Sequence, residues 1–428
     1  MFRRVYLDNS ATTPVDPDVL AAMMPYLTDK FGNASSIHFF GQETKAAIDK
    51  ARHQVAALIN SRPNEIVFTS GGTEANNLAV RGLLERNADT LARMSVASTR
   101  SGTNPESSSI GINDFVGRTG DVGKSVRAPH IITSAIEHPA VKSVCEDLEK
   151  QGFSVTYLPV YDDGLVRVED VKNAVRDETI LISVMFANNE IGTIQPVHDI
   201  GRMVRDLRGE GKKIWFHTDA VQAAGKVGVD VEEIGCDLLS VSAHKINAPK
   251  GVGALYIRRG VRLHSQNIGG RQERGVRGGT ESVPLIAAFG TACEIAKDRL
   301  GSESLRLTAM RDRFENAVLE NIPDSSVNGA VDRRLPNISN ISFRSIEGEG
   351  LLINLDMQGI AVSTGSACSS GSLEPSPVIR ALGKEDELAR GAIRFSFGTI
   401  NSEADVDRVL EVLPGSIDSL RNLSPKNR

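Results

Sequence analysis

The chain has 428 residues, 40% of them hydrophobic, and a formal net charge of −5, which suits a globular protein of two domains. This mild acidity gives no basic footprint for direct nucleic-acid binding, and no apolar stretch approaches the ~20 residues that span a bilayer. The first residues lack the apolar region of a secretory signal. We therefore expect a cytoplasmic protein without membrane or nucleic-acid partners.

The N-terminal part of the chain predicts an extended segment followed by helices. Residues 1–14 are expected to be extended, and residues 16–30 carry apolar side chains at helical spacing. A polar loop over residues 31–38 leads into an alanine-rich amphipathic helix over residues 41–60.

A strand, a glycine turn and a helix follow one another next. The apolar strand over residues 65–69 ends at Gly71-Gly72-Thr73, and residues 74–84 predict a helix. Backbone N–H groups at such a helix start can hold a phosphate, glycines allow its close approach, and a threonine adds a hydroxyl donor. The alternative is an ordinary turn in which Thr73 caps the helix.

The stretch from residue 87 to residue 127 differs in character from both of its flanks. Serine, glycine, threonine and asparagine dominate it, and large apolar side chains are few. Such a composition cannot form a core, so we interpret residues 88–127 as a flexible surface insertion. It could serve as a lid or as a partner-binding loop, and its role stays open.

Strands and helices alternate over the next part of the chain. Strands are predicted over residues 130–134, 154–159 and 179–187, and helices over residues 140–151, 168–177 and 197–209. Continuous apolar strands in this rhythm indicate a mostly parallel, doubly wound α/β sheet. His138 follows the first of these strands and could stack on a flat ring and move protons, or be a satisfied structural histidine.

Polar side chains follow two further apolar runs, residues 214–217 and 238–241, which predict neighbouring strands of the same sheet. Ligands bind at the carboxyl ends of such strands, where Asp219 and Lys245 should meet. Pyridoxal phosphate (PLP) needs a lysine for its Schiff base and an acidic partner for its pyridinium nitrogen. The pair therefore predicts a PLP site. The alternatives are a helix-capping Asp219 and a solvated Lys245, with Lys250 as a competing lysine.

The amino-acid composition changes after the last predicted strand of this sheet, residues 253–258. The elements expected beyond it are a polar glycine- and arginine-rich segment over residues 268–282, helices over residues 284–300, 305–320 and 350–358, and a strand over residues 337–343. We infer two domains. The large α/β domain covers residues 15–264, and a smaller α+β domain combines residues 1–14 with residues 265–428.

Two side chains near the C-terminus are candidates for chemistry. Cys368 lies among small residues that cannot pack a core, which makes it a candidate nucleophile. The four cysteines show no CxxC pattern, which argues against a disulfide framework or zinc site; they are Cys145, Cys236, Cys293 and Cys368. Arg394 lies in an apolar strand over residues 391–398 and calls for a carboxylate, from the protein or from a substrate.

Taken together, these motifs resemble the cysteine desulfurases of the NifS/IscS type, within the class V aminotransferase family of fold-type I PLP enzymes. The resemblance covers nearly the whole chain apart from the insertion. The matching runs are VYLDNSATTP, IVFTSGGTEANNLA, ITSAIEHPAV, ANNEIGTIQP, HTDAVQAAGK, SVSAHK, GGRQERGVRGGTES, STGSACSS and IRFSFG.

The resemblance implies a role for each matching residue. Lys245 would bind PLP and move protons at the substrate α-carbon, Asp219 would pair with the pyridinium nitrogen, and His138 would stack on the ring. Arg394 would hold the substrate carboxylate. Cys368 would take the sulfur as a persulfide. The remaining cofactor residues contact ring substituents or phosphate: Gly72, Thr73, Asn189, Gln222, Ser242, His244 and, from the neighbouring subunit, Thr280.

The resemblance thus implies a homodimeric sulfurtransferase that converts L-cysteine to L-alanine and passes sulfur to an iron–sulfur scaffold or another acceptor protein. No metal site is expected, although Cys368 could transiently contact an iron–sulfur cluster. Pro377 departs from the family pattern and bears on acceptor preference. The alternatives are a class V aminotransferase, a selenocysteine lyase, or a cofactor-free scaffold. The pathway, whether nitrogenase maturation, general iron–sulfur assembly or tRNA thiolation, stays open.

Overall fold

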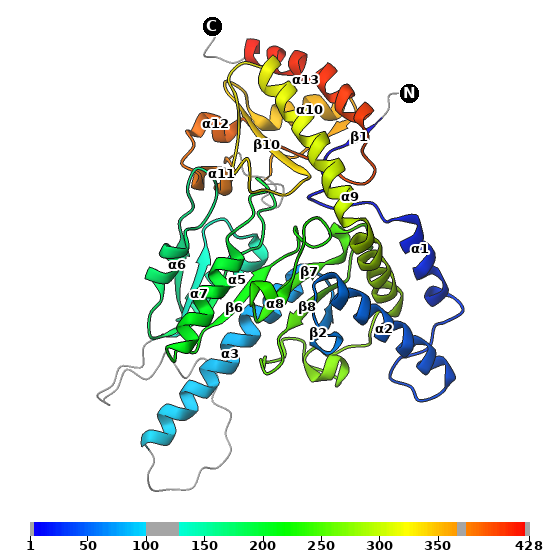
Figure 1. Ribbon diagram of the computed structural model, residues 1–428, viewed down its shortest axis with the longest axis vertical. Coiled ribbons are helices and arrows are strands. Elements are labelled where there is room, and N and C mark those ends of the chain that lie inside the picture. Colours follow the sequence, from blue (N-terminus) through cyan, green and yellow to red (C-terminus); the bar gives the residue numbers. More distant parts are fainter. Residues whose placement is uncertain (1–3, 100–127, 366–373, 424–428) are drawn as a thin grey trace.

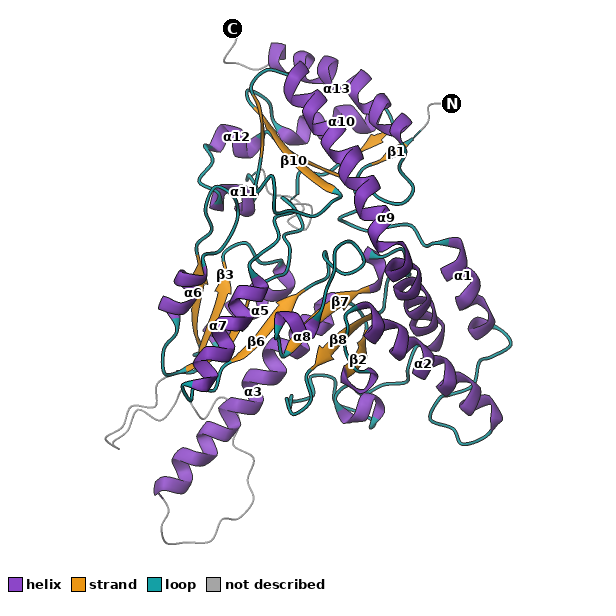
Figure 2. Ribbon diagram, in the orientation of Figure 1, coloured by secondary structure: helices purple, strands orange, loops and turns teal. Residues whose placement is uncertain are grey.

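The computed structural model describes residues 4–99, 128–365 and 374–423. A seven-stranded sheet forms its centre (Figures 1 and 2). In spatial order its strands are β2 (Ile66–Thr69), β8 (Gly253–Ile257), β7 (Leu238–Ser242), β6 (Trp215–Asp219), β5 (Thr179–Ser183), β3 (His130–Ser134) and β4 (Ser154–Leu158). Only β8 runs antiparallel to its neighbours within this sheet, which confirms the predicted mostly parallel sheet.

Helices cover both faces of the sheet. Successive strand residues point to opposite faces, and the strands are apolar on both, so each face must be buried. Leu181 joins one hydrophobic cluster while its neighbour Ile182 joins the other. The helices around the sheet are α2 (Phe39–Leu58), α3 (Gly72–Thr99), α5 (Pro139–Lys150), α6 (Val168–Ala174), α7 (Val197–Gly209) and the start of α9 (Val283–Asn321). The doubly wound α/β prediction is confirmed.

A smaller unit lies above the central sheet, at the top of Figure 1. It holds the antiparallel sheet β12–β10–β9, the parallel pair β1–β11, and helices with a third hydrophobic cluster. Its elements are β1 (Val5–Tyr6), β9 (Ser325–Val327), β10 (Ile338–Phe343), α10 (Gly348–Met357), β11 (Ile360–Ala361), β12 (Ala392–Ser396) and α13 (Glu403–Leu423). The N-terminal strand β1 pairs with β11 of this unit, and the predicted domain division stays a prediction.

Several predicted elements differ in the structure. The strand predicted over residues 179–187 ends at Ser183, and the helix predicted over residues 16–30 ends with η1 (Met24–Leu27). The helix predicted over residues 74–84 continues to Thr99, so the first part of the supposed insertion is helical. Alanine, leucine, arginine and methionine favour helix there, and averaging over the polar residues that follow hid this preference. Residues 100–127 lie outside the described residues.

A further difference concerns α9, which is one helix where two were predicted around Gly301. A glycine inside a helix costs only about 1 kcal/mol. Apolar side chains before Gly301, including Phe289, pack in a sheet cluster, and those after it, including Phe314, pack in the small unit. Figure 1 shows α9 passing from α2 to α13, so this helix connects the two parts of the fold.

Short helices complete the chain: α1 (Pro17–Met23), η1 (Met24–Leu27), η2 (Pro63–Glu65), α8 (Val231–Ile234), η3 (Ala243–Lys245), η4 (Gln272–Gly275), α11 (Pro377–Ala381) and α12 (Asp386–Arg390). Within the described ranges, no helix is both long and apolar enough to cross a membrane.

Candidate active site

The candidate site lies at the carboxyl ends of the central strands, the usual ligand position in a parallel α/β sheet. Asp219 ends β6, and the parallel β6–β7 register sets it opposite Ser240. Lys245 follows β7 by one short helical turn. His138 follows β3, and the charges of Asp219, Lys245 and Arg394 act on the pKa of its imidazole. The structure therefore brings these four predicted residues to one place.

The Lys245 side chain points at the N-terminal segment. Its Nζ donates hydrogen bonds to the backbone oxygens of Ser10 and Ala11, the latter at 2.7 Å. The backbone of Lys245 is held as well, because Lys226 Nζ donates to its carbonyl oxygen at 3.3 Å and to that of Gln222 at 3.2 Å. Burial and the charge of Lys245 lower the pKa of Lys226 to about 7. Lys226 thus ties together two segments that carry predicted cofactor residues.

Asp219 is buried and held in a fixed orientation. Its Oδ2 accepts a hydrogen bond from Asn76 Nδ2 at 2.6 Å, and its Oδ1 accepts one from the backbone N–H of Val221 at 2.9 Å. The two hydrogen bonds fix the direction in which the carboxylate points. A carboxylate held in one orientation suits a partner for a ring nitrogen.

His138 caps the start of α5, so the helix fixes its position. Its Nδ1 accepts a hydrogen bond from the backbone N–H of Ala140 at 3.1 Å, which leaves Nε2 as the protonated nitrogen of the neutral ring. Burial lowers the pKa of His138, Lys245 and Arg394 lower it further, and Asp219 opposes them. A neutral imidazole at this position can face a flat aromatic ring without adding charge to the site.

The glycine turn between β2 and α3 approaches the end of β7. A Cβ built on Gly72 would lie 2.9 Å from Val221 Cγ2 and 3.4 Å from Ser242 Cβ, so a larger residue would crowd this turn. Thr73 and His138 both line a pocket of about 350 Å³ beside the start of α3. Thr73, at the start of α3, therefore faces an open space next to His138, and helix starts of this kind can bind phosphate.

His244 and Thr280, two further predicted phosphate residues, do not line this pocket. His244 Nδ1 lies 3.2 Å from Thr12 Oγ1, and burial with nearby lysines lowers the pKa of His244 to about 4. Thr280 is exposed, in the segment between β8 and α9. That segment is tied to the start of α3 by the ion pair between Arg277 and Glu74.

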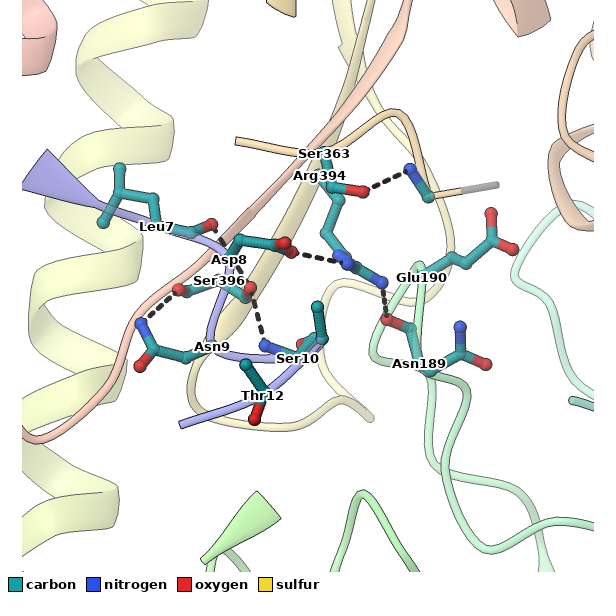
Figure 3. A network of polar contacts seen from close by, with 12 residues as sticks. Leu7, Asp8, Asn9, Ser10, Thr12, Asn189, Glu190, Ser363, Arg394 and Ser396 are labelled. Carbon is teal, nitrogen blue, oxygen red and sulfur yellow. Dashed lines mark hydrogen bonds and ion pairs between the residues drawn. The ribbon is translucent and has the colours of Figure 1, made fainter. Parts of the chain in front are cut away.

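Gln222 and Asn189 were predicted to contact ring substituents. Gln222 is buried, and its Nε2 donates to the Ser10 carbonyl oxygen at 3.0 Å, while its Oε1 has no hydrogen-bond partner within the described part of the chain. Asn189 lies beside Arg394 and offers its backbone oxygen to that guanidinium (Figure 3). An orphaned buried amide oxygen is costly unless a ligand or water satisfies it.

Arg394 occupies the centre of a polar network between the two parts of the fold (Figure 3). Its Nη2 donates to Asp8 Oδ1 at 2.7 Å and its Nη1 to the Asn189 oxygen at 2.8 Å. Nε is buried without a partner among the described residues. The sequence left open whether the carboxylate would come from protein or substrate, and the structure supplies Asp8 while leaving Nε unsatisfied.

Cys368 lies outside the described residues, so its predicted role stays a prediction. The other three cysteines, Cys145, Cys236 and Cys293, are free and buried. Sequence reasoning also missed Asp8 and Asn76, although both belong to runs that it quoted. Their partners, Arg394 and Asp219, lie far away in the sequence, and no local pattern signals such pairs.

Glu137, next to His138, yields a prediction about stability. Burial raises the pKa of its carboxyl to about 8, although its Oε1 accepts hydrogen bonds from Ser134 Oγ and the Met185 N–H, each at 2.8 Å. The folded state therefore binds more protons than the unfolded chain between pH 4.5, the ordinary value, and pH 8. The stabilising contribution of this group is present below that window and is lost as pH rises through it.

Glu137→Gln keeps an acceptor oxygen but cannot ionise. We expect the free energy of unfolding of the variant, relative to wild type, to increase from pH 5 to pH 8 by at most ~4 kcal/mol, since one pKa unit is worth about 1.4 kcal/mol. Urea denaturation at several pH values measures this difference. A difference that stays constant with pH would contradict a protonated Glu137.

The fold and the site together match the class of fold-type I PLP-dependent enzymes. The fold is a seven-stranded sheet with a smaller α+β unit. The site has a lysine and a buried aspartate that follow adjacent strands, next to a glycine turn. Comparison with known proteins narrows this class. The family model described as aminotransferase class-V matches residues 5–100 and 123–409, so only the part of the insertion between them is left unmatched within that span.

The relatives agree with this family. Cysteine desulfurase IscS of Dictyoglomus turgidum is 46% identical over 425 residues, which cover 99% of this chain and 97% of that protein. A solved structure titled NifS-like protein is 34% identical with a TM-score of 0.82, covering 98% of this chain and all of the other. A second, titled SspA in complex with cysteine, is 34% identical with a TM-score of 0.74, covering 92% and 98%. The chain belongs to the class V aminotransferase family, among its cysteine desulfurases of the IscS type.

Proposed function

We propose that this protein is a PLP-dependent cysteine desulfurase that converts L-cysteine to L-alanine and receives the sulfur on Cys368. The observation that carries the proposal is geometric. Lys245 Nζ bonds the Ser10 and Ala11 oxygens, and Asp8, two residues before Ser10, pairs with Arg394. Asp219 ends β6 at the same end of the sheet, and His138 caps the helix that follows β3. Membership among the cysteine desulfurases supports the activity, and the neighbour solved with cysteine supports cysteine as the substrate.

The residues at the site fit PLP. Lys245 would hold the cofactor covalently, Asp219 would pair with its ring nitrogen, and the turn at Gly72 and Thr73 would hold its phosphate together with Ser242 and His244. Gln222 Oε1 has no partner among the described residues. It fits a ligand that donates a hydrogen bond to it, either directly or through a water molecule. When bound, PLP would supply an electron sink for bond breaking at the substrate.

The protein's own groups would then bind the substrate and move protons. Arg394, whose Nε has no partner among the described residues, would hold the substrate carboxylate. Lys245 would take and return protons at the substrate α-carbon through Nζ. His138 would face the ring and keep its neutral form, since its pKa is lowered.

Cys368 would act as the sulfur acceptor. Its thiolate attacks the sulfur of the bound cysteine, and the new S–S bond forms as the substrate Cβ–S bond breaks. The electron pair of that bond stays with carbon, which takes up a proton and leaves as the methyl group of alanine. The products are therefore alanine and a persulfide on Cys368.

The proposal extends to partners and location. We propose a homodimer in which Thr280 of one subunit completes the phosphate site of the other, consistent with its exposed position. An iron–sulfur scaffold or another acceptor protein would take the persulfide sulfur, and the location would be cytoplasmic.

Cys368→Ser tests the proposal. We expect the variant to keep the visible absorption band of lysine-bound PLP but to lose alanine and sulfide release from L-cysteine by at least about 10²-fold, because serine cannot accept sulfur. Full activity in the variant would contradict a persulfide on Cys368 and would favour a lyase or aminotransferase reaction. A wild type that binds no PLP would support a cofactor-free scaffold.

A further inference from the structure

A single buried carboxylate, that of Glu190, touches both described flanks of the segment that contains Cys368. The chain is described up to Gly365 and again from Glu374. Glu190 is 6% exposed and follows Asn189 at the end of the sheet region. Its backbone is fixed, because its N–H donates to Asn188 Oδ1 at 2.8 Å and its oxygen accepts from Asn340 Nδ2 at 3.1 Å.

The flank on the C-terminal side is held by a hydrogen bond. Ser376 is buried, and its Oγ donates to Glu190 Oε2 at 2.6 Å. The same Oγ accepts from the N–H of Val378 at 3.1 Å and so caps α11, with Pro377 in the first helical position. Glu190 therefore determines where the chain enters this helix.

The flank on the N-terminal side is held by close packing. Gly365 has φ +85°, and a Cβ built on it would lie 2.5 Å from the same Oε2 atom of Glu190. Its N–H donates to Ser363 Oγ at 3.1 Å. Only glycine combines this backbone conformation with this approach to a carboxylate. Cys368 comes three residues after Gly365 in the sequence.

The same place holds the substrate-binding arginine. The backbones of Ser363 and Arg394 form an antiparallel bridge with hydrogen bonds of 2.7 and 3.2 Å. Figure 3 shows the Glu190 carboxylate beside the chain that continues from Ser363. Burial raises the pKa of Glu190, while Ser376 and Arg394 act in the opposite direction. Arg394 itself bonds Asp8 and the Asn189 oxygen, so its hydrogen bonds do not depend on the Glu190 side chain.

We propose that Glu190 is a positioning residue for sulfur transfer, which fixes both flanks of the Cys368 segment relative to the Arg394 site. This inference rests on the proposed desulfurase function. A nucleophile displaced by about 1 Å can lose about 10²-fold in rate. Removal of the Glu190 side chain should therefore slow the attack on sulfur and leave the binding of cysteine intact.

The first test compares binding with turnover in Glu190→Ala. We expect the rate of alanine formation to fall by about 10²-fold, while the cysteine concentration that half-saturates the spectral change of PLP stays within about threefold of wild type. Glu190→Gln, which keeps an acceptor for Ser376, should restore most of the rate. Weakened cysteine binding to the same extent as turnover would overturn the proposal, since Glu190 would then act through Arg394.

The second test uses no turnover. Alkylation of Cys368 by iodoacetamide, followed by mass spectrometry, reports how the segment is held. The three other cysteines are buried, and burial raises the pKa of Cys145 to about 12 and that of Cys293 well above its ordinary value, so they react slowly. Glu190→Ala should change the labelling rate of Cys368 severalfold. An unchanged rate would overturn the proposal.

Two further variants keep the inference separate from general instability. Glu315 is a stability control, because it is buried in the small unit and accepts from Ser339 Oγ at 2.7 Å, and it also pairs with Arg334. Glu315→Ala should lower the melting temperature without changing Cys368 labelling. Gly365→Ala should reproduce the Glu190→Ala effect. If wild type itself transfers no sulfur to Cys368, the proposed function fails; if it does and Glu190→Ala matches it, only this inference fails.

Discussion

Replacement of Lys245 by alanine is expected to abolish turnover of L-cysteine, with a loss of about 10⁴-fold or more, because the proposed covalent link to PLP and the proposed proton carrier at the α-carbon disappear together. Alanine release measures this loss, and the visible spectrum should lose the band of lysine-bound PLP. Lys245 is half-buried, and its Nζ bonds the carbonyl oxygens of Ser10 and Ala11.

Lys250 provides the matched control. It is exposed, and it follows Lys245 by five positions in the same connection. Lys250→Ala should keep both the spectrum and the rate of wild type. Lys226 is the remaining lysine close to the site, and its Nζ donates to two backbone oxygens. Retained PLP chemistry in Lys245→Ala would move the role to one of these two lysines and contradict the assignment.

The strands of the central sheet could be predicted because each is a short apolar run with its own boundary residues. β3 has the predicted bounds, and β6 and β7 differ from the predicted runs by one or two residues. Local signals also placed Asp219 and Lys245 after two neighbouring strands, so periodicity predicted their position in the fold, while their role stays a prediction.

Other features could not be predicted because they depend on contacts between distant segments. The glycine at position 301 signals a helix end locally, yet the cores on either side of it keep α9 continuous. The ion pair of Arg394 with Asp8 joins residues 386 positions apart. The Glu190 contacts with Gly365 and Ser376 are of the same kind. In each case tertiary packing decides what the local sequence leaves open.

Arg394→Lys is expected to weaken the binding of L-cysteine strongly. The guanidinium serves Asp8 and the Asn189 oxygen through Nη2 and Nη1, and it keeps Nε for a further acceptor. A lysine ammonium is a single point charge and cannot serve three acceptors in this planar arrangement. We expect the half-saturating cysteine concentration to rise by about 10²-fold, or about 2.7 kcal/mol, with a smaller change in the maximal rate.

L-Cysteine methyl ester tests whether the lost contact is the substrate carboxylate. The ester has no carboxylate, so wild type should bind it weakly and Arg394→Lys should change its binding little. Equal weakening for cysteine and ester would mean that the substitution disturbs the site in general. Asp8→Asn separates the two roles of the arginine, because it keeps an acceptor for Nη2 but removes the competing charge. Its cysteine affinity should therefore stay equal to that of wild type or rise, and a loss as large as that of Arg394→Lys would show that the ion pair, rather than the free Nε, holds the carboxylate site together.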